Sequence, residues 1–482
     1  MQEEGDRLDR ETKGRWVLQA LDRAFRESQQ DAIFVVDAVR IREQVAAIRD
    51  AFSPVTHVHL TAPLGVLEGR YLRRPHPKGS TPQPYSKVRE NLTERNVDEL
   101  RHLADIVIDT NRCRPEDVLV RAAGKLSLYG ERGGGFVDVI VGGEFGSEGK
   151  GQVVAYLSRE YDLLVRVGGP NAGHKVPEKD GPFTHHQLPS GTRRSRARLL
   201  LAPGMVVNVE KLLKEIGECR VDAHRLSIDP QVMIISEDDV KREEGVKERI
   251  ASTAQGVGEA TARKITDRGK RGVKLARDVK ELKPFIRTAE SVLTDAYAKN
   301  QRVLLEGTQG TGLSLYHGYY PYVTSRDTTV AGCLAEAGIP PSRVRKVISV
   351  SRTYPIRVES PQQGTSGPMW AEISLEEISR RSHIGLKELM RVERTSTTDR
   401  KRRIGEFDWV LLRKATFLNG PTDIALTFTD YLSKSNRKAM RFDQLTKETI
   451  NFIEEMERVS GAPVSLISTG FSLRSVIDRR KW

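Results

Sequence analysis

The sequence predicts an α/β fold in which a mostly parallel central sheet is flanked by helices, together with a smaller N-terminal α/β segment. Short apolar runs, such as 136–141 and 303–306, have the length and composition of buried strands. Stretches with apolar residues at helical spacing, such as 280–299 and 447–459, lie between such runs. A glycine-rich joint at 131–135 divides the chain into two differently patterned parts.

Length and composition exclude several classes of protein. The chain has 482 residues, of which 38% are hydrophobic and 30% are charged, so we expect a sizeable core and no wholesale disorder. Its apolar runs are shorter than the about 18 residues that a membrane span needs, and its polar N-terminus lacks the chemistry of a secretory signal. The widely spaced Cys113, Cys219 and Cys333 favour neither a disulfide framework nor a zinc site. We therefore expect a cytoplasmic protein with no membrane partner.

The formal net charge of +13 favours anionic partners, namely nucleic acid, an acidic membrane surface or small phosphorylated ligands. Composition alone does not choose among them. The basic residues are dispersed along the chain, however, and aromatic residues make up only 6% of it. Because single strands are usually held by interleaved basic and aromatic side chains, nucleic-acid binding is not expected.

The N-terminal part, residues 1–130, is expected to contain a small parallel α/β unit. Its apolar runs at 32–37, 57–60 and 106–109 predict strands. Residues 40–52 have apolar side chains at helical spacing and predict the helix between the first two strands. Strand, helix and strand at these lengths are typical of a parallel connection.

The larger part, residues 136–482, alternates strands and helices over a greater length. That alternation is typical of a parallel sheet with helices on its faces. The expected strands are 136–141, 163–167, 303–306, 344–350, 424–428 and 464–467, and the expected helices include 152–159, 280–299 and 447–459.

A strand, a glycine loop, a lysine and a helix follow one another at 136–159. Backbone N–H groups of such a turn converge on phosphate oxygens, and Lys150 adds a positive charge where the helix starts. The loop departs from the standard phosphate loop, because Glu144 takes the position of its first glycine and Gly151 that of its serine or threonine. The alternative interpretation is a tight structural turn.

A second glycine turn, Gly168-Gly-Pro-Asn-Ala-Gly-His174, begins directly after the expected strand 163–167. His174 is thereby placed at a sheet edge, among small residues that admit a ligand. A lone histidine is usually structural or exposed. Near a phosphate loop, it becomes a candidate for stabilising negative charge on a substrate oxygen.

The two stretches VGGEFGSEGKGQVVAYL and RVGGPNAGHKV resemble the adenylosuccinate synthetase family. The resemblance covers about residues 136–482, and the short length and the ending at 476–480 are similar to the archaeal and phage branches. Further matches follow in the same order: Leu188-Pro-Ser-Gly191, Glu306-Gly-Thr-Gln-Gly310, Tyr320-Pro-Tyr-Val-Thr-Ser325, Arg402-Arg-Ile-Gly405, Thr427-Phe-Thr-Asp430 and Ile467-Ser-Thr-Gly470.

The resemblance implies the P-loop fold of this family and a two-step ligation. The γ-phosphoryl group of ATP or GTP moves to O6 of a 6-oxopurine nucleotide, and the amine of L-aspartate then displaces that phosphate. Phosphorylation is needed because an amide-like oxygen is a poor leaving group. The implied catalytic residues are Ser147, Lys150, His174 and Gln309, and the implied Mg²⁺ ligands are Ser147 and the carbonyl of Gly173.

The resemblance also assigns binding residues by position. The loop 395–403, whose cations would otherwise predict a solvated surface, is implied to hold aspartate through Thr397, Thr398, Arg400 and Arg402. The implied nucleotide- and phosphate-binding residues are Gly146, Glu148, Gly149, Gly151, Asn171, Ala172, Thr253, Arg268, Thr324, Asp430, Ser468 and Gly470.

Ser147 stands where the family has an aspartate that serves as the base at purine N1 and as a Mg²⁺ ligand. A serine hydroxyl still binds Mg²⁺ but does not readily take a proton. The same substitution marks the phage branch that resembles this family and acts on dGMP. We therefore favour a dGMP-type acceptor; the alternatives are an ordinary enzyme acting on IMP and a nucleotide-sensing homologue without catalysis.

The donor and the oligomeric state follow from two further positions. Asp430 occupies the position at which the family reads guanine, whereas Phe428 replaces a lysine and the phage branch uses adenine nucleotides, so ATP and GTP both stay open. In this family, an arginine of the partner subunit completes the nucleotide site. The candidates by spacing are Arg263 and Arg268, which implies a homodimer.

The N-terminal part lies outside that resemblance. Residues 34–37, 57–63, 67–74 and 104–109 resemble the later half of a nucleoside monophosphate kinase, but no phosphate loop precedes them. The expectation is a degenerate kinase segment that acts as a docking domain. The alternative is that a partner chain supplies the missing loop.

Overall fold

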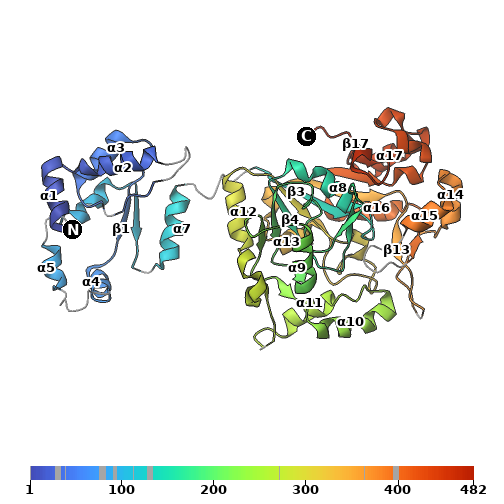
Figure 1. Ribbon diagram of the computed structural model, residues 1–482, viewed down its shortest axis with the longest axis horizontal. Coiled ribbons are helices and arrows are strands. Elements are labelled where there is room, and N and C mark those ends of the chain that lie inside the picture. The colour runs from blue at the N-terminus through green and yellow to red at the C-terminus, as the bar shows by residue number, and fades with distance from the viewer. Residues whose placement is uncertain are drawn as a thin grey trace. The chain divides into compact units, whose positions relative to one another are not determined.

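The computed structural model describes residues 2–27, 34–37, 39–74, 83–90, 95–111, 113–126, 134–270, 272–362, 364–393 and 401–482. The chain divides into two compact units, Met1–Tyr129 and Gly130–Trp482 (Figure 1). Among the described helices, none has the length and apolar character needed to cross a membrane.

The first unit contains a two-stranded parallel sheet, in which β1 (Val58–Thr61) pairs with β2 (Ile106–Asp109). Both strands and the helix α3 (Arg42–Ala51) confirm the sequence predictions for these segments. Its other helical elements are α1 (Gln2–Thr12), α2 (Trp16–Arg26), α4 (Leu64–Leu72), α5 (Tyr85–Arg89), η1 (Val97–Leu103) and α7 (Pro115–Lys125).

The predicted strand at 32–37 is wrong. The described residues of that run, 34–37, form no strand, and Val35 is 88% exposed. The sheet of this unit consists of β1 and β2 among the described residues, so the run has no strand to pair with. One apolar residue of the run, Phe34, instead stacks its ring on that of Phe25, with the ring centroids 4.1 Å apart.

The second unit is built on a nine-stranded sheet with the order β17-β16-β15-β12-β3-β11-β4-β7-β9. All neighbouring strands are parallel except the edge strand β17, which confirms the predicted α/β class. The strands are β3 (Val137–Gly142), β4 (Leu163–Arg166), β7 (Arg198–Leu201), β9 (Leu226–Ile228), β11 (Val303–Glu306), β12 (Val344–Arg352), β15 (Asp423–Thr427), β16 (Val464–Ser468) and β17 (Val476–Asp478).

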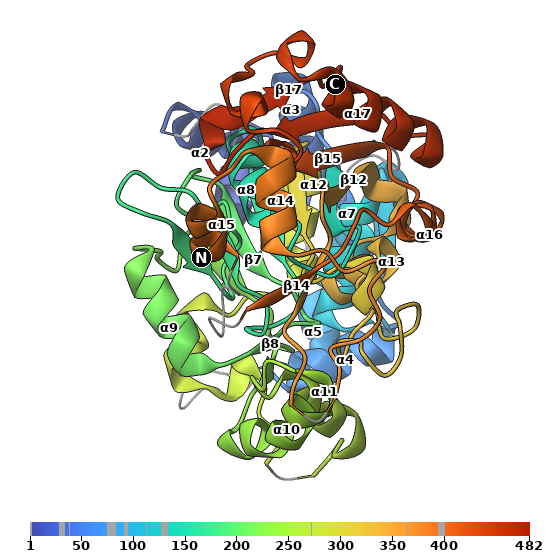
Figure 2. The ribbon, with the colours of Figure 1, turned by 90° about the vertical axis from the view of Figure 1, so that its right-hand side faces the viewer.

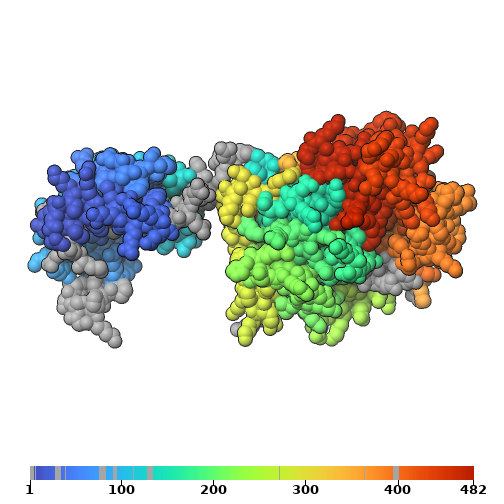
Figure 3. Space-filling model, turned by 45° about the horizontal axis from the view of Figure 1, so that its top comes forward, coloured from blue at the N-terminus to red at the C-terminus, as the bar shows by residue number. Residues whose placement is uncertain are grey.

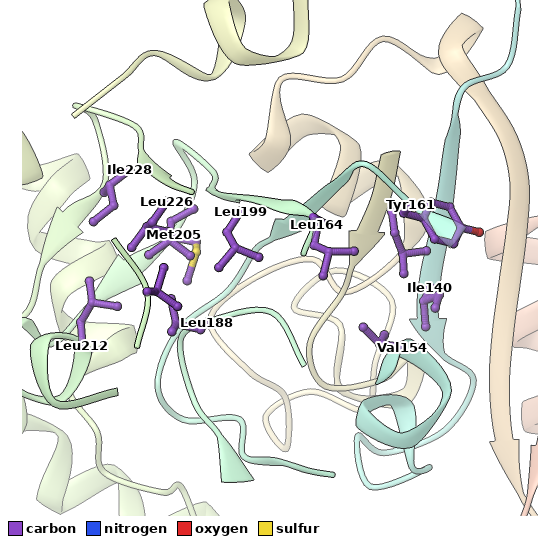
Figure 4. Packing of buried hydrophobic residues seen from close by; sticks show 14 of the residues in the cluster. Ile140, Val154, Tyr161, Leu164, Leu188, Leu199, Met205, Leu212, Leu226 and Ile228 are labelled. Atoms are coloured by element: carbon purple, nitrogen blue, oxygen red, sulfur yellow. The ribbon is translucent and has the colours of Figure 1, made fainter. Parts of the chain in front are cut away.

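Helices cover both faces of this sheet, which explains why its strands are apolar without alternation. On one face, Ile140, Leu164 and Leu199 pack with α8 (Lys150–Leu157) and α9 (Val209–Glu218) (Figure 4). The alternate strand residues, such as Val139 and Val165, pack with α12 (Ala289–Ala298) and α13 (Val330–Ala337) on the other face.

The second unit contains further helices and small sheets. The remaining helices include α10 (Glu237–Ile250) and α11 (Val257–Thr266), which lie together, as do α14 (Leu375–Ser382) and α15 (Leu386–Val392) (Figures 1 and 2). A third apolar cluster combines α16 (Trp409–Asn419) and α17 (Lys447–Ser460) with β15 and β16. Three two-stranded sheets complete the unit: β5 (His174–Val176) with β6 (Phe183–His185), β8 (Val206–Val207) with β10 (Met233–Ile234), and β13 (Ile356–Val358) with β14 (Arg402–Ile404).

The single long helix predicted at 280–299 is wrong in part. It is divided into the 3-10 helix η4 (Lys280–Phe285) and α12. Pro284 lies inside η4 and disfavours continuation of a regular helix, and Thr288 caps the start of α12.

Candidate active site

The glycine loop between β3 and α8 surrounds a carboxylate of its own, that of Glu148. This carboxylate accepts hydrogen bonds from the backbone N–H groups of Glu144 (3.0 Å) and Gly146 (2.8 Å). Its second oxygen lies 2.6 Å from the ammonium of Lys150, which also donates to the carbonyl of Gly146 (3.2 Å). The Lys150 and Glu148 side chains are both buried, so each charge needs a partner close by, and the two groups neutralise each other.

Close backbone contacts hold this loop against the loop that follows β11. A Cβ atom at Gly142 would lie 2.5 Å from the carbonyl oxygen of Gln309, and one at Gly146 would lie 3.0 Å from Gln309 Cα. The side-chain amide of Gln309 donates to Asn171 Oδ1 at 3.1 Å. The glycine loop, Gln309 and the second glycine turn therefore lie together.

His174, the first residue of β5, lies in a buried network of charged side chains. Its Nδ1 is 2.5 Å from the carboxylate of Glu306, and the same carboxylate is 2.6 Å from Arg166. Ser190 donates its backbone N–H to the second carboxylate oxygen at 2.7 Å. Glu306 ends β11 and Arg166 ends the neighbouring parallel strand β4, so the sheet itself positions the partners of His174.

This network sets the protonation of His174. Burial and the charge of Arg166 lower the pKa of the imidazole. Burial opposes the charge of Glu306, but Arg166 and His174 outweigh it and lower the pKa of that carboxyl. Nδ1 lies 2.5 Å from the Glu306 carboxylate, which only accepts, and 2.7 Å from the guanidinium of Arg166, which only donates. The shorter contact favours a proton on Nδ1 that is donated to Glu306, while Arg166 pairs with the same carboxylate. Nε2 is then an acceptor, and it is buried without a partner in the described part of the chain, which marks it as a group aimed at a ligand.

The start of α8 is in direct contact with His174. A Cβ atom at Gly151 would lie 3.0 Å from the Cβ of His174 and 3.2 Å from the carbonyl oxygen of Lys175. Glycine is therefore required where ordinary phosphate loops have serine or threonine. The charge of the preceding Lys150 contributes to the lowered pKa of His174, so both groups belong to one buried site.

A cavity of about 320 Å³ is lined by Asp430, Ser468 and Gly470, the residues expected to hold the donor base. Gln152 of α8 donates its amide to the carbonyl of Gly470 at 2.9 Å, which ties the cavity to the helix of Lys150. In the space-filling view, the teal segment that contains α8 accordingly lies against the red C-terminal segment (Figure 3).

Asp430 is paired within this cavity. Its carboxylate accepts a hydrogen bond from Arg437 at 3.0 Å, and Arg437 also lies 2.8 Å from Glu388. Burial raises the pKa of Asp430, and Arg437 opposes that shift. All three side chains line the cavity, which therefore offers guanidinium donors as well as carboxylate acceptors.

A second buried network, which the sequence analysis missed, is centred on Glu393. This carboxylate pairs with Arg352 and Arg402, each at 2.9 Å, and accepts a hydrogen bond from the hydroxyl of Tyr431 at 2.7 Å. Although burial opposes its ionisation, the two arginines lower the pKa of Glu393 to about 2. Arg352 also donates to the carbonyl of Ser147 at 3.4 Å. The network thus joins the glycine loop to Arg402, an expected aspartate-binding residue.

The sequence contains one signal for these missed residues. Arg352 is a charged residue at the carboxyl end of an apolar strand, like Arg166 and Glu306. Such a residue faces the edge at which parallel α/β sheets bind ligands. The other expected aspartate-binding residues, Thr397, Thr398 and Arg400, lie outside the described residues.

Glu144 is a further buried carboxyl in the glycine loop. One of its oxygens accepts the backbone N–H of Arg352 at 3.0 Å, and the other has no partner in the part of the chain that the structure describes. Burial and the charge of Glu148 raise the pKa of Glu144 well above its ordinary value.

The residues expected to hold Mg²⁺ present oxygen donors of the right kind. Ser147 and Gly173 are both half-buried, and they lie in the first and second glycine turns. Among the described residues, no group of three or more histidine, cysteine or acidic side chains forms a cage for a metal. Because Mg²⁺ usually takes only one or two protein oxygens together with phosphates and water, a hydroxyl and a carbonyl suit it.

The remaining expected residues border the site or lie at the surface. A Cβ atom at Gly169 would lie 3.0 Å from Val257, which starts α11, so the loop carrying Thr253 lies near the second glycine turn. Arg263 is committed to its own chain through a 2.6 Å pair with Asp239. The other residues are the half-buried Ala172 and Thr324, the α8 cap Gly149, whose φ is +90°, and the exposed Arg268.

Comparisons with known proteins identify the family. The family model for adenylosuccinate synthetase matches residues 139–281 and 273–437. The adenylosuccinate synthetase of Pyrococcus horikoshii is 39% identical over 351 residues, which are 71% of this chain and 98% of that protein. That of Methanocaldococcus jannaschii is 38% identical over 351 residues, or 71% of this chain and 96% of the relative.

Two solved structures have the same fold. One is a cyanophage S-2L succinoaminodeoxyadenylate synthetase (PurZ) bound to dGMP and to dATP as an energy donor; it is 26% identical, has a TM-score of 0.60, and covers 72% of this chain and 96% of its own. The other is the fully ligated adenylosuccinate synthetase of Plasmodium falciparum, at 23% identity and a TM-score of 0.61, covering 72% of this chain and 100% of its own, which bears on the fold alone.

Proposed function

Because the chain belongs to the adenylosuccinate synthetase family, we propose that it joins L-aspartate to C6 of a 6-oxopurine nucleotide through a 6-phosphoryl intermediate, with a dGMP-type acceptor. Family membership makes the chain a ligase that forms a C–N bond with consumption of a nucleoside triphosphate. The observation that carries the proposed route is the contact between Gly151 and His174, which brings Lys150 and the imidazole to one buried site.

In the first step, O6 of the purine attacks the γ-phosphorus, the bond to the β–γ bridging oxygen breaks, the nucleoside diphosphate leaves, and the N1 proton of the purine passes to water. An entering triphosphate takes over the ammonium of Lys150 from Glu148, so this buried charge stays paired. Gln309 and Asn171, which are hydrogen-bonded to each other beside the loop, are proposed to contact the acceptor nucleotide.

His174 is proposed to act at O6. Its Nε2 accepts a proton when phosphate charge enters the site, and the resulting imidazolium is balanced by Glu306. In the second step, the aspartate amine attacks C6, the C6–O6 bond breaks, and phosphate leaves with the proton that the amine gives up. Arg402, held by Glu393, is proposed to bind an aspartate carboxylate.

Mg²⁺ is the proposed cofactor. The hydroxyl of Ser147 and the carbonyl of Gly173 would hold it, together with phosphate oxygens and water. When bound, the ion neutralises charge on the phosphates.

The acceptor is proposed from the chemistry of Ser147. An uncharged hydroxyl leaves room beside N1 for a purine that carries a 2-amino group. The phage enzyme named as bound to dGMP supports this choice at 26% identity. A second candidate acceptor is IMP, which the 39% identity to an archaeal adenylosuccinate synthetase favours.

The donor and the assembly are proposed from side chains at two other positions. Asp430 accepts hydrogen bonds from guanine, whereas the guanidinium of Arg437 donates to ring nitrogens of adenine, so ATP and GTP are both proposed as donors. Since Arg263 is paired with Asp239, Arg268 is the arginine proposed to complete the site of a second subunit in a homodimer.

The test is a panel of reactions with aspartate, Mg²⁺, ATP or GTP, and either dGMP or IMP. We expect aspartate-dependent phosphate release with dGMP and a succinylated product by mass spectrometry. Ser147→Asp should shift the ratio of kcat/KM toward IMP by about tenfold or more, since each 1.4 kcal/mol of differential binding is tenfold. Turnover of IMP alone by the unaltered chain overturns the dGMP assignment, and no turnover with any pair identifies a nucleotide sensor.

A further inference from the structure

We propose that a basic cavity binds a linear oligophosphate such as the tail of a nucleoside triphosphate. The cavity lies at the amino ends of β4 and β7, whereas the catalytic residues lie at the carboxyl ends of the strands. The cavity has a volume of about 700 Å³. Five arginines line it: Arg159, Arg193, Arg194, Arg196 and Arg198. The only carboxylate in that lining is Asp162.

The arginines come from two separate segments, so the fold brings them together. Arg159 follows α8, and the other four lie in the run that leads into β7. The guanidinium of Arg159 donates to the carbonyl of Arg194 at 3.1 Å, which joins the two segments. Hydrogen bonds from Arg225 to the carbonyls of Thr192 (2.6 Å) and Ser195 (2.8 Å) fix the backbone of the run. The cavity is therefore a built feature of the fold and more than a row of mobile surface cations.

This positive charge is only partly balanced within the described residues. Arg198 is neutralised by Asp295 at 2.7 Å. Arg193 and Arg194 share the single carboxylate of Glu178 at 3.7 and 4.0 Å, which are long separations for ion pairs. The Nε of Arg194 is buried without a hydrogen-bond partner in the described part of the chain. Like charges gathered in this way repel one another, so a multivalent anion would stabilise the arrangement.

The shape and chemistry of the cavity favour a phosphate chain over nucleic acid. Guanidinium groups bind phosphate oxygens through paired N–H donors, and several arginines around one hollow match several linked phosphates. A nucleic-acid strand needs stacking surfaces as well. The aromatic ring in the lining, Tyr161, is 5% exposed and is covered by Arg302 at 5.2 Å. The geometry thus provides for phosphates and offers little to bases.

The cavity is separate from the catalytic site. Asp162 and Arg198 precede or start β4 and β7, whereas Arg166, at the far end of β4, contacts Glu306 and His174. The side chains of β4 between these ends are fully buried, so no channel along the strand joins the two places. A strand of this length separates its ends by about 10 Å. A ligand bound here therefore adds to the proposed active-site ligands and does not compete with them.

The test measures binding of inorganic tripolyphosphate to the full chain by calorimetry. We compare the unaltered chain with the double variant R193E/R196E, in which two exposed lining arginines are reversed. The matched control is K447E/R458E, which makes the same change in net charge at two exposed positions of α17. Because the glycine loop binds the probe as well, we expect two classes of site in the unaltered chain and in the control.

The expected result is loss of one class of site in R193E/R196E, with its affinity weakened by about tenfold or more, and unchanged ligase turnover. If the double variant unfolds, Arg196→Ala is measured in its place. Equal binding by R193E/R196E and K447E/R458E overturns the proposal. So does a duplex DNA that binds in an R193E/R196E-sensitive manner while tripolyphosphate does not. If the unaltered chain shows no ligase turnover, the proposed function is contradicted, but the binding proposal is not, because calorimetry measures binding without catalysis.

Discussion

Among the described residues, the second unit contains ion pairs in which both side chains are buried, whereas those of the first unit are exposed. In the first unit, Arg49 pairs with Asp105 at 2.7 Å, and their side chains are 35% and 46% exposed. In the second unit, Lys150 pairs with Glu148 at 2.6 Å, and the exposures are 1% and 0%. The difference comes from the sheets, since two strands do not enclose a charge, whereas nine strands covered on both faces do.

The comparison teaches where chemistry is built. An exposed ion pair is screened by water and contributes about 0–1 kcal/mol. A buried pair is held in one geometry, and removing one partner leaves a charge that is destabilising by about 3–5 kcal/mol. Buried pairs at the carboxyl edge of the large sheet are therefore suited to exchange a protein partner for a substrate, and exposed pairs in the first unit are not.

Lys150→Ala is expected to have the largest effect on turnover. Loss of the buried ammonium removes support from the transferred phosphoryl group, so we expect kcat to fall by about 10³-fold. The measurement is aspartate-dependent phosphate release. Arg49→Ala, which removes a paired cation from the first unit, is expected to leave kcat unchanged. Equal losses of kcat in both variants would show that the buried pair of the second unit is no more important for turnover than the exposed pair of the first.

Glu306→Gln is expected to have the next largest effect. It leaves Arg166 and His174 without their shared negative charge, so turnover is expected to fall by about 10²-fold. Stability is expected to fall by about 3–5 kcal/mol, measured as the free energy of unfolding in urea. Asp105→Asn is the matched control, because it removes the carboxylate of an exposed pair. A loss of less than about 1 kcal/mol for Glu306→Gln would mean that this buried pair contributes no more to stability than an exposed pair does.

Glu144→Gln is expected to change stability in a pH-dependent manner. The folded pKa of Glu144 lies above its ordinary value of 4.5, so this carboxyl favours the folded state at low pH, and that contribution is lost as pH rises above this value. A glutamine does not titrate. The variant should therefore gain stability relative to the unaltered chain with rising pH, by on the order of 1–2 kcal/mol, measured by thermal unfolding between pH 5 and 8. A difference that is constant with pH would contradict the raised pKa.

The smallest expected effect comes from removing the first unit. The 351 matched residues make up 98% of the Pyrococcus horikoshii relative, which is therefore too short to contain a counterpart of the first unit as well. Gly130–Trp482 is for that reason expected to fold alone. We expect kcat/KM to change by less than about twofold, which is below 0.5 kcal/mol. A larger loss would give the first unit a part in catalysis, and phosphorylation of dGMP by the full chain that disappears with this deletion would identify it as an active kinase segment.

The apolar pattern predicted most of the second unit and less of the first. Strands such as 303–306 and 464–467 are buried on both faces, so local composition was sufficient. The run at 32–37 has similar composition, but its described residues, 34–37, pair with no strand in the described part of the chain, and pairing depends on distant residues. Likewise, Lys150 and His174 are marked by the glycines around them, whereas Arg352 and Glu393 meet across 41 positions and share no local pattern.

Three consecutive residues at the start of α8 each have a different task. Lys150 faces the glycine loop, Gly151 abuts His174, and Gln152 reaches the carbonyl of Gly470. One turn of helix thus fixes the positions of the glycine loop, the imidazole of His174 and the cavity residue Gly470 relative to one another. Inserting a single residue here would rotate the residues that follow by about 100° and break all three contacts at once, whereas a substitution at one of the three positions disturbs one contact.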